Sequence, residues 1–166
     1  MFRFFLLTEK NLYDIVVYTN DREELIMDKK ECLLSGCLYF SSNKFVRALT
    51  KLAEDEFKIT GLTPTYAFAV TIVNKYGKIS STELAEYLQM APSTITRFVD
   101  KLLIKNLVER RIDGKNSFIF STEEGKKLQE NINIAWKNLE KSLSDKLGQE
   151  ESRELVLMLN KASERL

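Results

Sequence analysis

The sequence predicts a mainly α-helical (α+β) fold, and three of its features carry that prediction. From Leu34 onward, apolar residues recur at spacings of three and four, which is the period of an amphipathic helix. Proline, which breaks helices, occurs only as Pro64 and Pro92. One short stretch instead alternates apolar and polar residues on both sides of Asp113-Gly114, a pattern typical of a β-hairpin.

Composition excludes several classes of enzyme. The chain has 166 residues, of which 44% are hydrophobic and 30% charged, with a net charge of +1; this is the balance of a soluble domain with a real core. Histidine is absent, which removes histidine-based triads and histidine metal ligands. The paired acids Glu123-Glu124 and Glu150-Glu151 stand at predicted helix starts, where they complement the helix dipole. We therefore expect no enzyme activity, no metal and no cofactor.

Residues 1–33 are interpreted as an N-terminal extension. Their apolar start is too short for a signal-peptide core, and we expect Cys32 and Cys37 to be reduced thiols of a cytoplasmic protein without a membrane segment. The extension has weak periodicity up to Met27. Arg22-Glu23-Glu24 can be encoded by a purine-rich stretch that resembles a bacterial ribosome-binding site, which favours Met27 as the native start. The alternative is a genuine arm that adds to a subunit interface.

Two helices are predicted before the centre of the chain. The first runs from Leu34 to near Gly61, and the second starts at the cap Thr63 with Pro64 in its first position and continues through Val73. The apolar residues that define the first helix are Leu34, Leu38, Phe45, Leu49, Leu52 and Phe57.

Two short helices follow with a tight turn between them. Ser80 and Glu83 fit a capping box that opens the first of the pair. Pro92 opens the second, which runs to about Lys105. This arrangement predicts a helix-turn-helix, followed directly by a β-hairpin of residues 107–112 and 117–121, which forms a wing.

Long helices after the hairpin predict a dimer. One runs from Thr122 to Gly148 and another continues to the C-terminus. Their apolar stripes exceed what the small winged core can cover, so we expect a two-fold homodimer. Residues 34–60 and 122–166 are the predicted dimerisation helices, and 61–121 the winged helix-turn-helix region.

The helix that begins at Pro92 presents small hydroxyl and cationic side chains opposite its apolar face. Short hydroxyls let a helix enter a DNA major groove closely, and Arg97 can fork onto guanine or clamp a phosphate. Residues 92–116 hold six basic and three acidic side chains, which favours phosphate binding. The candidate DNA contacts are Ser81, Pro92, Ser93, Thr94, Thr96, Arg97, Lys101, Arg110, Arg111 and the wing-tip Lys115. Asp100 pairs either within its own helix or with a cation of the wing.

Five ordered blocks of the sequence resemble MarR-type transcriptional regulators over roughly residues 34–166. These blocks are Leu62-Thr63-Pro64, residues 81–88 (STELAEYL), 93–102 (STITRFVDKL), 107–110 (LVER) and 121–125 (STEEG). The resemblance implies homodimers that bind pseudo-palindromic double-stranded operator DNA and usually repress, and that release DNA on sensing a small aromatic compound or an oxidant. The chain departs from the family in its short wing, with Lys115 at the tip, and in Ala91, where a capping residue is common.

Candidate sensing residues follow from the same resemblance. An effector pocket between the dimerisation helices and the winged core would be lined by Tyr39, Phe40, Phe45, Phe57, Tyr66 and Phe68, although each of these is also a natural core residue. An alternative is a redox-sensing regulator that uses Cys37 as the sensing thiol and Cys32 as the resolving thiol. The competing interpretation is that Cys37 is simply a small buried residue. A further alternative is a winged helix used only for protein contacts.

Overall fold

The computed structural model describes residues 34, 36–113 and 116–166. The N-terminal extension, with Met27 and Cys32, and Lys115 at the wing tip lie outside the described residues. The chain divides into two compact units, Met1–Lys51 and Leu52–Leu166. Among the helices that are described, none is both long and apolar enough to cross a membrane.

The first described helix differs at both ends from the prediction. Helix α2 spans Leu38–Phe57 rather than starting at Leu34, and a 3-10 turn, η1 (Lys58–Thr60), follows it. The Thr60 hydroxyl donates to the carbonyl of Phe57 at 2.7 Å and accepts from the amide of Leu62 at 3.1 Å. These local bonds compete with a continuing helix, which is why the α-helical ladder stops before Gly61.

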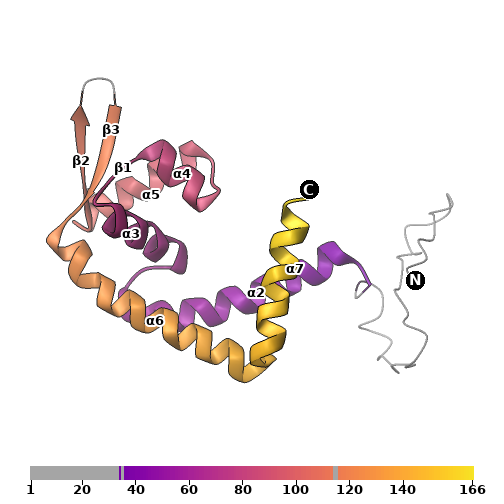
Figure 1. The fold of residues 1–166 in the computed structure, drawn as a ribbon. Coiled ribbons are helices and arrows are strands. Elements are labelled where there is room, and N and C mark those ends of the chain that lie inside the picture. Colours follow the sequence, from indigo (N-terminus) through magenta and orange to yellow (C-terminus); the bar gives the residue numbers. More distant parts are fainter. Residues whose placement is uncertain (1–33, 35, 114–115) are drawn as a thin grey trace, which may run out of the picture. The chain divides into compact units, whose positions relative to one another are not determined.

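Three helices form the centre of the second unit (Figure 1): α3 (Pro64–Tyr76), α4 (Ser81–Leu88) and α5 (Pro92–Ile104). Helix α3 extends beyond the predicted end at Val73. Thr63 occupies its N-cap position but makes no side-chain cap bond there. The predicted capping box of α4 is confirmed.

A three-stranded antiparallel sheet stands beside these helices in the order β1-β3-β2. Strands β2 (Val108–Asp113) and β3 (Asn116–Ser121) are the predicted hairpin. Strand β1 (Lys78–Ser80) was missed by the sequence prediction, and it joins the sheet through the pairing of Ile79 with Ile119.

Two helices complete the second unit: α6 (Glu123–Leu147) and α7 (Gln149–Ser163). Gly148, with φ +89°, separates them. Helix α6 packs against α3 and η1, whereas α7 has no buried residue.

The core of the second unit contains apolar side chains from both the helices and the sheet. Phe57, Leu84, Ile119 and Ile132 are fully buried, and they come from α2, α4, β3 and α6 respectively. The predicted mainly helical winged helix-turn-helix fold, with long helices before and after it in the sequence, is therefore confirmed.

Candidate nucleic-acid interface

Helix α5 has two distinct faces, as its sequence spacing predicts. Ile95, Val99 and Leu102 are at most 1% exposed and fix the helix to the core. The other face carries candidate DNA contacts: Ser93, Thr96, Arg97 and Lys101 are exposed, and Thr94 is half-buried. The helix thus offers hydroxyls and cations to solvent on a rigidly anchored support.

The start of α5 depends on proline rather than on a side-chain cap. Ala91 is the N-cap residue and makes no capping bond, while the exposed Pro92 occupies the first turn. The Thr96 hydroxyl donates to the Pro92 carbonyl at 3.1 Å. Its proton is therefore used within the helix, and its methyl group and lone pairs are left for contacts with a base edge or methyl group.

A capping box holds the N-terminus of α4, where the candidate contact Ser81 lies. The backbone N–H of Ser80 donates to Glu83 Oε2 at 2.8 Å, and the Ser80 hydroxyl donates to it at 2.7 Å. These bonds hold the pKa of the Glu83 carboxyl below its usual range. Ser81, the first helical residue, is half-buried beside this capping box.

An ion pair ties the wing to α5. Arg110 of β2 donates to Asp100 of α5 at 2.9 Å. Of the two pairings that the sequence allowed for Asp100, the structure therefore has the one with a cation of the wing. Arg111 points to the other face of the strand, where it pairs with Glu109 and its guanidinium carbon lies 4.8 Å from the ring centre of Phe120. Both described wing arginines therefore have protein partners.

A double-mutant cycle on Asp100→Ala and Arg110→Ala is expected to give a coupling of about 0.5 kcal/mol in the free energy of unfolding. The value is small because Asp100 is 51% exposed and Arg110 31% exposed, so water and salt screen the pair. Urea denaturation at low and high salt measures it. A coupling above about 2 kcal/mol, or one independent of salt, contradicts this assignment.

The candidate effector aromatics occupy distinct surroundings. In the first unit, Tyr39 is 79% exposed, and Phe40 and Phe45 are half-buried. In the second unit, Phe57 and Phe68 make ring contacts with each other and with Trp136. Trp136 was not among the predicted pocket residues, although it stands next to the apolar stripe of its helix.

Tyr66, by contrast, packs on the candidate DNA-binding helix. Its ring stacks on Phe98 with centroids 4.2 Å apart, and Lys101 Nζ lies 5.5 Å from the ring centre of Tyr66. This geometry is within the range of a cation–π contact. It places Tyr66 in support of α5.

The candidate redox residues are only partly described. Cys37 is a half-buried free thiol, and Cys32 lies outside the described residues. No group of three or more potential metal ligands occurs in the part of the chain that the structure covers.

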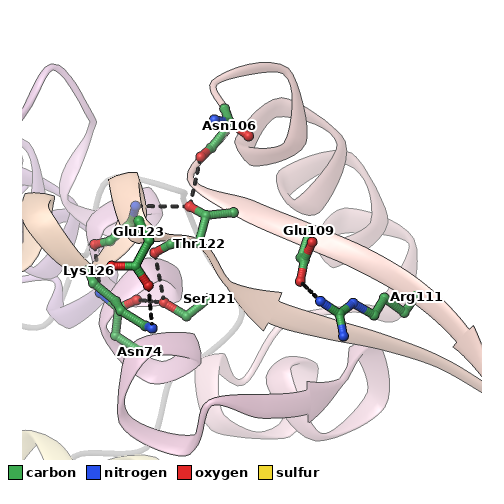
Figure 2. Close-up of polar contacts among 9 residues, drawn as sticks. Asn74, Asn106, Glu109, Arg111, Ser121, Thr122, Glu123 and Lys126 are labelled. Carbon is green, nitrogen blue, oxygen red and sulfur yellow. Dashed lines mark hydrogen bonds and ion pairs between the residues drawn. The ribbon is translucent and has the colours of Figure 1, made fainter.

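The first turn of α6 is joined to the turn that follows α5 (Figure 2). The Thr122 hydroxyl accepts from the amide of Gly125 at 3.0 Å and donates to the carbonyl of Asn106 at 2.8 Å. Asn106 has a φ of +56°, a conformation that asparagine tolerates better than most residues. Sequence reasoning identified Thr122 as a helix start but did not find this link.

Comparisons with known proteins match the winged helix-turn-helix region. Residues 62–116 match the model of the MarR family. The HTH-type transcriptional repressor MdtR of Bacillus subtilis is 32% identical over 68 residues, which are 39% of this chain and 44% of that protein. The match thus spans less than half the length of this curated relative.

Solved structures extend the likeness to most of the chain. A probable transcriptional regulator from Pseudomonas aeruginosa has a TM-score of 0.72 at 20% identity, covering 78% of this chain and 98% of that one. A mutant MarR from E. coli complexed with operator DNA has a TM-score of 0.69 at 19% identity, covering 75% of this chain and 92% of that one. These likenesses establish the same fold.

Proposed function

We propose that this chain is a homodimeric DNA-binding transcriptional regulator of the MarR family without enzyme activity, and the match of residues 62–116 to the model of that family supports this. The observation that carries the proposal is the two-faced helix α5. Its apolar face is buried, and its opposite face exposes Ser93, Arg97 and Lys101. An anchored helix with short hydroxyls and cations on its outer face suits insertion into a major groove.

The wing and α4 have supporting roles in this proposal. Ser81 lies at the start of α4, where a hydroxyl suits a phosphate contact. Arg110 orients the wing through Asp100. The exposed Arg111 and the wing-tip Lys115 contact the phosphates of the DNA backbone.

Exposed apolar side chains support the homodimer. Helix α7 presents Val156, Leu157, Met158 and Leu159 to solvent, with Leu157 68% exposed. Four consecutive exposed apolar residues on a helix need another surface to cover them. A second copy of the chain supplies that surface symmetrically. In this proposal residues 34–60 and 122–166 are the dimerisation helices, and the exposed residues of α7 support the second of these ranges.

Salt-dependent binding tests the proposal against the alternative of a protein-interaction module. DNA fragments selected from a random library by the protein are titrated by fluorescence anisotropy at several salt concentrations. We expect log K to fall by about 0.9 per phosphate neutralised, and footprinting to show two half-sites about one DNA turn apart. Binding without salt dependence, or none at low salt, contradicts the proposal.

Arg97→Ala is expected to weaken operator binding by about 1–3 kcal/mol. The side chain is exposed on the outer face of α5, so its loss should leave the midpoint of unfolding unchanged. Arg165→Ala, which removes an exposed arginine near the C-terminus, is the matched control. Equal affinities for the Arg97→Ala and Arg165→Ala variants would remove Arg97 from the interface.

Repression and release by an effector complete the proposal. Repression is supported by the similarity to the MdtR repressor. The predicted signal for release is a small aromatic compound. To test the thiol alternative, DNA binding by the wild type and by Cys37→Ser is measured before and after oxidation of the protein. Loss of binding in the wild type alone would favour the redox alternative.

A further inference from the structure

Asn74 joins three elements at the place where the wing passes into α6 (Figure 2). It lies near the end of α3 and accepts a hydrogen bond from the hydroxyl of Ser121, the last residue of β3. Its amide nitrogen donates to the carbonyl of Gly125 at 2.8 Å and to Gln129 Oε1 at 2.9 Å, both in α6. Both amide protons of Asn74 therefore have a partner in α6.

Gln129 continues the network without leaving a donor unused. Its amide donates to the Thr71 hydroxyl at 3.2 Å and to Asn133 Oδ1 at 3.0 Å. The junction thus consists of Thr71, Asn74, Ser121, Gly125 and Gln129, all in the second unit. The hydrophobic effect is non-directional, whereas hydrogen bonds need defined distances and angles. A satisfied polar network therefore restrains the direction of α6 relative to α3 and β3.

Because α6 is long, a small change in its direction displaces its far end by a large distance. The helix has 25 residues, so it is about 37 Å long at about 1.5 Å per residue. A change of about 10° at its first turn moves its far end by about 6 Å, more than the ~3.4 Å rise of one base pair. If α6 carries the dimer contacts, a small rotation at the junction changes the separation of the two recognition helices by more than one base-pair step.

We propose that Asn74 is a positioning residue that, through Ser121, Gly125 and Gln129, sets the angle between the winged helix-turn-helix and α6 and thereby the operator half-site spacing that the dimer accepts. This inference rests on the proposed function as a DNA-binding dimer. Asn74 acts through other residues and touches no DNA in this scheme.

The first test measures spacing selectivity. A duplex selected by the wild-type protein is altered by inserting or deleting one base pair between its half-sites, and affinities are measured for wild type and Asn74→Ala. We expect wild type to lose about tenfold or more on altered spacing and Asn74→Ala to vary within about threefold. The salt dependence should be the same in both proteins, because the phosphate contacts are unchanged.

Two further variants complete this test. Asn133→Ala is the matched control, because Asn133 bonds to Gln129 within α6 alone; it should keep the wild-type spacing profile. Gln129→Ala leaves the bonds from Asn74 to Ser121 and Gly125 intact and should relax spacing more weakly than Asn74→Ala. It replaces Asn74→Ala if that variant does not fold by circular dichroism.

A second test needs no DNA. With Cys32 and Cys37 replaced by serine, spin labels on exposed Glu86 of α4 and Lys137 of α6 report the intramolecular distance by double electron–electron resonance in protein diluted with unlabelled chains. We expect a wider distance distribution in Asn74→Ala than in wild type and Asn133→Ala.

The outcomes separate the positioning role from the proposed function. An unchanged spacing profile in Asn74→Ala, or an unchanged distance distribution, overturns the positioning role while DNA binding by the wild type stands. If the wild type binds equally well at every half-site spacing, the positioning role is overturned and the proposed DNA-binding function stands. Failure of the wild type to bind any DNA at low salt overturns both proposals.

Discussion

Gly125→Ala is expected to lower the free energy of unfolding by about 3 kcal/mol, the upper end of the usual penalty for overpacking. A Cβ atom at Gly125 would lie 2.1 Å from the carbonyl oxygen of Leu107 and 3.4 Å from the Thr122 hydroxyl. The obstacle is backbone, so no change of rotamer relieves it. In an unobstructed helix, glycine to alanine stabilises by about 0.5–1 kcal/mol, and the structure therefore reverses the sign of the effect.

Gly61→Ala is the control for this substitution. Gly61 has a φ of +65°, and an added Cβ there would meet nothing within 4 Å. Its cost should be about 1–2 kcal/mol, from the left-handed conformation alone. Urea denaturation of both variants measures the difference. If Gly125→Ala is as stable as wild type, α6 does not pack as closely on Leu107 as the structure has it.

Elements with local signals were predictable from the sequence. The capping box at Ser80 and Glu83, the start of α6 at Thr122 and the hairpin around Asp113-Gly114 each depend on residues a few positions apart. Strand β1 carries no such signal, because three residues are too few for a period. It exists through its pairing of Ile79 with Ile119, which no local pattern indicates.

The candidate interface shows the same limit. Helical spacing was enough to assign Ile95 to the buried face of α5 and Arg97 to the exposed face, because both follow from one period. The partners of individual polar side chains were not predictable in this way. Asn74 and Gly125 are 51 positions apart, so their bond depends on how α3 meets α6, which the packing of the whole unit decides.

Phe57→Ala is expected to lower the free energy of unfolding by about 3–5 kcal/mol. Phe57 is completely buried, and its ring meets those of Phe68 and Trp136 edge to face, at 6.0 Å and 5.6 Å between centroids. Truncation removes these contacts and leaves a cavity that the neighbouring helices can close only in part. Phe57→Leu, which keeps most of the volume, should cost less than about 1.5 kcal/mol.

The same variant separates a core role for Phe57 from a role in an effector pocket. A core cavity made by truncation stays dry and accepts small apolar compounds, so benzene or indole should raise the thermal midpoint of Phe57→Ala and leave that of the wild type unchanged. An effector pocket lined by Phe57 predicts the opposite order, with the wild type stabilised and the variant indifferent. Phe57 is completely buried and in edge-to-face contact with Phe68 and Trp136, and for this reason we expect the first result.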